Sequence, residues 1–202
     1  MEKTWYEEHV QNRTLFKYII GYLARWKMNL TYEYARRLAR KNGAKIGDHS
    51  VISIKLAKKA NKNLVIGDHT SIQTDAIDVR VPIKIGNNVI IGYGTEIISV
   101  SHNIDSPEWE HKYYGIEIED YVWIPTKVLV LPSCRKIGRG AVIGSGSVVV
   151  KNVDAMSVVS GNPASEFKKR KCVHSDLVVE HLLGGDFDAY RNTWKKKSRK
   201  NE

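Results

Sequence analysis

The sequence predicts a mainly β protein built as a parallel β-helix, because a six-residue period runs through it from residue 46 onward. Glycine often follows the apolar residue, and a small or β-branched residue often stands three places after that glycine. Neither a helical period nor a two-residue strand period explains this pattern. The periodic apolar positions are Ile46, Ile52, Ile66, Ile72, Ile85, Ile91, Ile97, Ile118, Ile124, Ile137, Ile143 and Val149.

The spacing determines the expected geometry. If each six-residue unit forms a short strand and a corner, three units close one triangular coil, and every sixth side chain points into an aliphatic core. Each coil adds about 4.8 Å along the axis, so the roughly five coils that fit between Ile46 and Asp154 would be about 25 Å long. The glycines would serve corners that need either a positive φ or a close backbone approach.

The N-terminal segment, residues 1–44, is predicted to form an amphipathic helix. Its apolar residues stand at helical spacing, with basic residues beside them. Two interpretations follow: a helical cap over the open end of the β-helix, or a helix that contacts a membrane surface. The apolar residues are Leu15, Ile19, Leu23, Trp26 and Leu30, and the basic ones are Arg13, Lys17, Arg25 and Lys27.

The repeat occupies residues 45–164 and breaks once, at 103–117, where Pro107, several aromatics and mixed charges cannot continue the coil. We expect an excursion loop there, with His102 at its base, because loops on rigid scaffolds often carry function. Residues 165–202 form a C-terminal extension, expected to be helical and basic. Its basic clusters are Lys168, Lys169, Arg170 and Lys171, and a tail with Lys195, Lys196, Lys197, Arg199 and Lys200.

Composition favours a single domain with appendages and an anionic partner. The chain of 202 residues has 32 Lys and Arg against 22 Asp and Glu, a net charge of +10. A charged terminal run is, however, usually a solvated tail. Cys134 and Cys172 provide no disulfide framework, and no signal peptide or long apolar run is evident. These features favour a cytoplasmic location, with the inner face of the membrane as the alternative that the amphipathic helix suggests.

Several ordered motifs resemble the hexapeptide-repeat acyltransferases, particularly galactoside, maltose and polysaccharide O-acetyltransferases. The motifs are SVSHNID, VWI, IGRGAVIGSGSVVVK and SGNPA, and the resemblance covers about residues 46–171. It implies a homotrimer of left-handed parallel β-helices, an exception to the usual right-handed crossover. It also implies acetyl-CoA as co-substrate, a sugar or saccharide acceptor, and no metal.

His102 matches the catalytic histidine of that family. Transfer of an acetyl group from a thioester to an alcohol needs a base near neutrality, and an imidazole suits this because its unperturbed pKa is about 6.5. Asp75, Asp105 and Glu117 are candidates to orient the ring, and a backbone carbonyl could do so equally well. The remaining histidines have no comparable sequence context.

The resemblance also assigns the acetyl-CoA site residue by residue. Trp123 matches a tryptophan by the thioester, and Thr126 and Ser145 match residues whose backbone N–H groups face the thioester carbonyl and the pantetheine arm. Lys151 matches a lysine near the coenzyme. Lys168 matches a basic residue for the coenzyme phosphate, a role that Lys169 or Arg170 could fill instead.

On the acceptor side the chain departs from the galactoside enzymes. Ile72 and Arg80 stand where those enzymes have a sugar-binding Asn and Asp, so their acceptor does not carry over. Near the coenzyme, Pro125 replaces a usual glycine. The replacement candidates for the acceptor are Asp75, Asp78, Arg80, Asn103, Asp105 and Trp109, with Trp109 suited to stack on a sugar face.

Other functions stay open with less support. An N-acetyltransferase of an amino sugar or nucleotide sugar would use the same base and donor site. A γ-type carbonic anhydrase would need three histidines converging on zinc, and a sugar nucleotidyltransferase commonly has a nucleotide-binding domain before its β-helix. A non-enzymatic protein that binds anions or nucleic acid gains from the charge of +10 but has no recognition motif, so no nucleic acid partner is expected.

Overall fold

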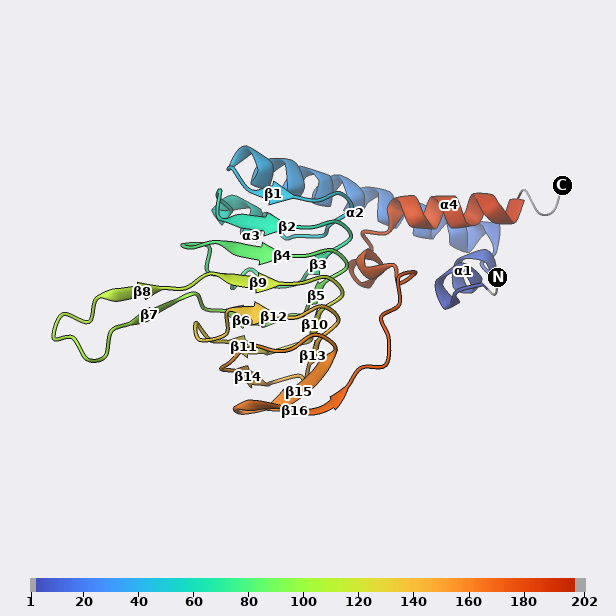
Figure 1. Cartoon of the computed structure of the whole chain (residues 1–202). Coiled ribbons are helices and arrows are strands. Elements are labelled where there is room, and N and C mark those ends of the chain that lie inside the picture. Colours follow the sequence, from blue (N-terminus) through green and yellow to red (C-terminus); the bar gives the residue numbers. More distant parts are fainter. Residues whose placement is uncertain (1–2, 199–202) are drawn as a thin grey trace.

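The computed structural model describes residues 3–198 as a stack of short parallel strands with a helical annex at one end (Figure 1). The helices are α1 (Trp5–Gln11), α2 (Leu15–Lys41), α3 (Ile54–Lys59), the 3₁₀ helix η1 (Val179–Leu183) and α4 (Phe187–Ser198). The strands are β1 (Lys45–Ile46), β2 (Leu64–Ile66), β3 (Ser71–Ile72), β4 (Ile83–Ile85), β5 (Ile90–Ile91), β6 (Glu96–Ile97), β7 (Val100–His102), β8 (His111–Tyr113), β9 (Ile116–Ile118), β10 (Trp123–Ile124), β11 (Leu129–Val130), β12 (Lys136–Ile137), β13 (Val142–Ile143), β14 (Val148–Val149), β15 (Ser157–Gly161) and β16 (Ala164–Lys169).

Three sheets make up the stack. The first has the order β1-β2-β4-β9-β12, the second β3-β5-β10-β13-β15-β16, and the third β6-β11-β14. All of these pairings are parallel except that of β15 with β16. From β4 to β14 the chain visits the first, second and third sheets in turn, leaving only once for the excursion at β7 and β8. A mainly β fold with a helical N-terminus is therefore confirmed.

The periodic apolar residues form the core of this stack. In the first sheet Ile46 pairs with Ile66, Ile66 with Ile85, and Ile85 with Ile118, one coil to the next. Every predicted inward position is buried, with exposures from 0% to 6%. Since equivalent side chains stack on one another, each coil repeats the same environment, which is why the sequence repeats the same residue types.

Glycines and small residues close the corners. A side chain at Gly92 would place its Cβ 2.6 Å from the carbonyl carbon of Pro125 in the next coil, so this glycine serves a close approach and has no positive φ. Positive φ values fall at other corner positions, including His69 and Asn88. The buried hydroxyl of Thr70 donates to the Gly86 carbonyl at 2.7 Å, which satisfies a backbone acceptor inside the stack.

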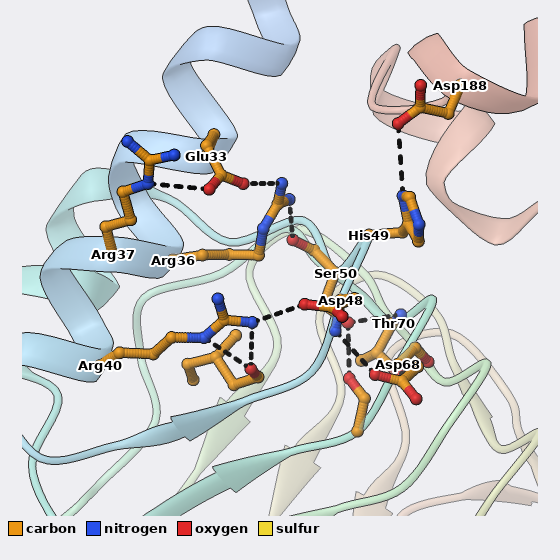
Figure 2. Close-up of polar contacts among 12 residues, drawn as sticks. Glu33, Arg36, Arg37, Arg40, Asp48, His49, Ser50, Asp68, Thr70 and Asp188 are labelled. Carbon is orange, nitrogen blue, oxygen red and sulfur yellow. Dashed lines mark hydrogen bonds and ion pairs between the residues drawn. The ribbon is translucent and has the colours of Figure 1, made fainter.

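The C-terminal half of α2 covers the first coil, as Figure 2 shows. Ala35 and Ala39 are fully buried and belong to the main core. The Arg36 guanidinium donates to the Ser50 carbonyl at 2.9 Å, and Arg40 donates to the Ile46 carbonyl at 2.9 and 2.7 Å. Glu33 pairs with Arg36, whose hydrogen bond lowers the pKa of the Glu33 carboxyl. This half of α2 is thus the cap that the sequence suggested.

A second, smaller core forms the annex beyond the edge of the stack. Tyr6 of α1 and Tyr190 of α4 are buried there, with Tyr18 and Tyr22 of α2 packed against them. Asp186 is 1% exposed and accepts hydrogen bonds from Tyr6 at 2.6 Å and from Arg25 at 2.9 Å. The two termini of the chain therefore meet in one cluster.

Three features differ from the expectations. The excursion is a β-hairpin, with β7 and β8 antiparallel, rather than an irregular loop. Helix α3 is inserted between the first two coils, where only the six-residue pattern was expected. The C-terminal extension begins with β16, which folds back on β15 before the helical part. Of the basic tail, Arg199 and Lys200 lie outside the described residues.

Candidate active site

His102 lies at the end of β7 on the hairpin that projects from the stack, a feature we call the arm (residues 100–113) (Figure 1). The arm leaves the stack after β6, at the corner between the third and first sheets. The side chains of His102, His111 and Tyr113 are exposed. A catalytic group on the arm is therefore accessible to a substrate from solvent.

One backbone contact orients the His102 ring. Its Nδ1 lies 2.5 Å from the carbonyl oxygen of Trp109, and because a carbonyl only accepts, Nδ1 carries the proton. In the neutral ring with the proton on Nδ1, the lone pair is on Nε2, which can accept a proton from a substrate hydroxyl. Trp109 has a left-handed backbone, with φ of 50°, which belongs to the turn that brings its carbonyl back toward His102.

The carboxylates considered for this role lie elsewhere. Asp75 forms an ion pair with Lys55 at 2.8 Å, and Glu117 is an exposed residue of β9. No hydrogen bond joins Asp105 to His102 within residues 3–198. Of the alternatives left open by the sequence, the backbone carbonyl is the one the structure supplies.

His111 is a neighbour of His102 that the sequence did not single out. The two residues are cross-strand partners in the arm, with ring centroids 4.4 Å apart. Tyr113 stacks on His111 at 5.8 Å. Predicting a hairpin for the excursion would have revealed this pair, because antiparallel pairing around a turn near Pro107 places residues 102 and 111 opposite each other.

The acceptor candidates fall into three groups. Asp78 and Arg80 lie near the base of the arm, since Ser99 donates to the Asp78 carbonyl at 3.1 Å. Arg80 donates to the Asp78 carboxylate at 2.9 and 2.8 Å and lowers the pKa of that carboxyl to about 2. Within the arm, Asn103 donates to Glu110 at 2.6 Å, and Asp105 and Trp109 are exposed. Asp75, three residues before Asp78, is instead paired with Lys55 of α3.

Thr126 and Ser145 lie in one column, which we call the donor corner, where the second sheet turns into the third. The Lys127 N–H donates to the Tyr93 carbonyl at 3.0 Å, and the Gly146 N–H donates to the Thr126 carbonyl at 3.1 Å. These bonds tie equivalent corner residues of successive coils together. The structure therefore places these two coenzyme-site candidates at equivalent corners of successive coils, and their roles stay predictions.

Trp123 lies on the outer face of the second sheet, opposite Ile90 and Val142 in neighbouring strands. Its side chain is 48% exposed and lines a small cavity with Arg170 and residues of the C-terminal extension. Neither Thr126 nor Ser145 lines this cavity, so the Trp123 side chain faces the C-terminal extension and not the donor corner.

The basic candidates have different surroundings. Lys168 is exposed on β16 and forms no ion pair in the described part of the chain, whereas Lys169 pairs with Glu166 at 2.9 Å. Arg170 donates to the carbonyls of Tyr121 and Gly140, at 3.2 and 3.3 Å, and so is committed to the structure. Lys151 follows β14 and lies at the far end of the third sheet from Ser145. Among the described residues, Lys168 and Lys151 thus have no ion pair, and Lys168 is the one that the resemblance assigns to the coenzyme phosphate.

The candidates thus form two separate sets in one chain. The donor set follows the second sheet and its corner, and the His102 set follows the arm, with the third sheet between them. No group of three or more metal-ligating side chains is placed to hold an ion among residues 3–198. None of the helices described there is long and apolar enough to cross a membrane.

Comparison with known proteins identifies the family. The "Putative colanic acid biosynthesis acetyltransferase WcaF" of Escherichia coli is 30% identical over 146 residues, which are 72% of this chain and 80% of that protein. The crystal structure of a hexapeptide-repeat-containing acetyltransferase from Vibrio cholerae superimposes with a TM-score of 0.56 at 26% identity, covering 84% of this chain and 95% of the other. The chain belongs to the hexapeptide-repeat acetyltransferases.

Other acetyltransferases match smaller parts of the chain. Galactoside O-acetyltransferase of Lactococcus lactis is 33% identical over 138 residues, which are 65% of this chain and 58% of that enzyme. The chain spans less than half the length of some other acetyltransferases that it matches. No family model matches the chain.

Proposed function

We propose that the protein transfers the acetyl group of acetyl-CoA to a hydroxyl of a sugar, in a saccharide or surface-polysaccharide precursor. The observation that carries this proposal is the His102 imidazole, whose proton is held at Nδ1 by the Trp109 carbonyl so that Nε2 is a free base on the exposed arm. Family membership supports the acetyl donor. The names of two relatives, which refer to a galactoside and to colanic acid, support a saccharide acceptor.

In the proposed reaction, Nε2 of His102 removes the proton of the acceptor hydroxyl while its oxygen attacks the thioester carbonyl carbon. A tetrahedral intermediate forms, and its C–S bond then breaks to give the acetyl ester. The protonated imidazole returns its proton to the leaving sulfur, so the base is regenerated. The backbone N–H groups at the donor corner would stabilise the negative charge that develops on the oxygen.

We also propose that the stack is a closed left-handed β-helix and that three copies share their sites. In one chain the third sheet separates His102 from Thr126 and Ser145. A neighbouring copy that presents its donor corner to the arm would bring both sets together. If light scattering finds only the 23.0 kDa chain and that species is fully active, this part of the proposal is wrong.

A mass-spectrometric screen tests the function. The full chain is incubated with acetyl-CoA and a panel of simple sugars, oligosaccharides, nucleotide sugars and amino sugars, and each product is examined for one added acetyl group. Ester products that are released by mild alkali would support O-acetylation. Alkali-stable amides on amino sugars alone would contradict it and favour N-acetylation. Hydrolysis of acetyl-CoA without acceptor modification would contradict both.

A further inference from the structure

The first part of α2 carries an exposed apolar face, which we call the apolar stripe. Its residues follow one side of the helix over about 24 Å, at the helical rise of about 1.5 Å per residue. Their exposed fractions lie between 46% and 73%, well above those of core residues. The stripe consists of Leu15, Phe16, Ile19, Ile20, Leu23, Trp26 and Leu30.

The stripe is not the face by which α2 packs in its own chain. Tyr18 stacks on Trp194 of α4 at 4.1 Å, and Gly21 lies against Tyr190. Arg25, on the same side, forms an ion pair with Asp186 at 2.9 Å. The annex thus uses one face of α2 and leaves the stripe uncovered by any described residue. An exposed patch of this size is typical of an interaction site.

The charged residues of α2 that flank the stripe are all basic. From Gln11 to Tyr32 the sequence has four basic residues and no Asp or Glu. Asp186 neutralises Arg25, but Lys17 and Lys27 are exposed beside the stripe. A cavity of about 620 Å³ between α1 and α2 opens next to Ile20; Lys17, Arg13 and His9 line it, together with Glu8.

We propose that the apolar stripe binds the surface of an anionic lipid bilayer, with α2 lying in the plane of the headgroups. Leu, Phe and Trp side chains on one face with lysines at its edges suit the boundary between headgroups and acyl chains. The lysines attract anionic lipid and add affinity that salt weakens. A second copy of the chain is a poorer partner for the stripe, because two segments with basic residues and no Asp or Glu would repel each other.

Vesicle flotation with the full chain tests the proposal. We expect the protein to float with vesicles of phosphatidylcholine mixed with phosphatidylglycerol, to float much less with phosphatidylcholine alone, and to be partly released by high salt. Replacing Ile19 and Leu23 together by Gln should lower the partition coefficient about tenfold or more, since two aliphatic side chains no longer enter the lipid. Both residues are exposed, so the melting temperature should stay unchanged.

Matched controls separate the stripe from general effects. Leu182→Gln alters an exposed leucine of η1 outside the stripe and should leave flotation unchanged. Lys17→Glu with Lys27→Glu should abolish the preference for anionic vesicles. The same charge change at Lys58 and Lys59 of α3 should have little effect, because charges far beyond a Debye length of about 8 Å are screened.

Three results would overturn the proposal. The wild-type chain could fail to float with anionic vesicles, or the double Gln variant could float as well as the wild type. Alternatively, the double Gln variant could change the oligomeric state in light scattering while neither protein binds vesicles. That result would make the stripe an interface between copies.

Discussion

The donor corner and the arm both hold predicted site residues, but they are held in different ways. Thr126 and Ser145 follow the fully buried Ile124 and Ile143, and a backbone hydrogen bond from the Gly146 N–H to the Thr126 carbonyl ties their two coils together. His102 stands on a two-stranded hairpin whose strands pair only with each other, and every residue of β8 is exposed.

This difference indicates which set of site candidates is held firmly by its own chain. The donor corner is exposed, but it directly follows buried core residues of two coils, so its geometry is as stable as the stack. A two-stranded hairpin is marginally stable by itself in water, so the position of His102 depends on the Trp109 contact and on whatever covers the arm. The following predictions test this distinction.

The largest effect is expected on the arm. His102→Ala should lower kcat by about 10²- to 10⁴-fold, the usual contribution of a positioned base, and leave the Kd for acetyl-CoA unchanged because the donor corner is intact. Steady-state kinetics and calorimetric titration measure the two quantities. His111→Asn, on the partner strand, is the matched control and should cost less than tenfold. If His111→Asn lost most of its kcat while His102→Ala kept full activity, His111 and not His102 would be the general base.

The next effect concerns the donor corner. In Gly92→Ala the new Cβ would meet the Pro125 carbonyl carbon at 2.6 Å and the Thr126 nitrogen at 2.8 Å, so the corner must shift. We expect a several-fold rise in KM for acetyl-CoA and a loss of about 1–3 kcal/mol in the free energy of unfolding, as in other overpacked sites.

Gly67→Ala provides the control for that prediction. Its Cβ would meet the Gly86 carbonyl carbon at 2.7 Å, at a corner away from Thr126. Chemical denaturation should give a similar loss of stability in both variants, with KM changed only in Gly92→Ala. Equal changes of KM would mean that the donor site is not localised at its corner.

The contrast between the repeated stack and the single arm also explains which features could be predicted from the sequence. The core was predictable because each coil repeats one environment, so Ile85 and Ile118 recur at equivalent places. The group that orients the His102 ring was not predictable, because it is a backbone carbonyl, which every residue has. Helix α3 is a single insertion with no repeat to reveal it. The commitment of Arg170 to two carbonyls follows from β16 folding back, a tertiary event that charge alone does not reveal.

A smaller effect is expected among the basic residues. Lys168→Ala should raise KM for acetyl-CoA by about two- to fivefold with kcat nearly unchanged, and the rise should shrink at high salt, because an exposed charge contributes modestly. Arg170→Ala should instead lower the melting temperature, since its guanidinium donates to the carbonyls of Tyr121 and Gly140. Deleting the tail from Lys195 onward should leave acetyl-CoA kinetics unchanged. A higher KM in the tail deletion alone would place the coenzyme phosphate elsewhere.

The smallest effect concerns the corner between the first and second sheets, and tests whether it is independent of the donor corner and of the corner that carries the arm. There His69 lies 3.1 Å from Glu180 of η1, and this hydrogen bond raises the pKa of the His69 imidazole. A raised pKa in the folded state means that the pair stabilises the fold fully below the ordinary imidazole pKa of about 6.5, and that this contribution is lost as the pH rises through the raised value.

His69→Asn should therefore reduce the melting temperature by about 1–3 °C near pH 5.5, and by progressively less as the pH rises through the raised pKa of the His69 imidazole. Asparagine tolerates the left-handed backbone at this position, where φ is 53°, so the loss reports the pair rather than strain. Thermal denaturation across this pH range measures the difference. The KM for acetyl-CoA should stay constant throughout, because Glu180 contacts a corner that carries neither Thr126 nor His102. A pH-independent loss of stability, or a KM that follows it, would show that the corners are coupled.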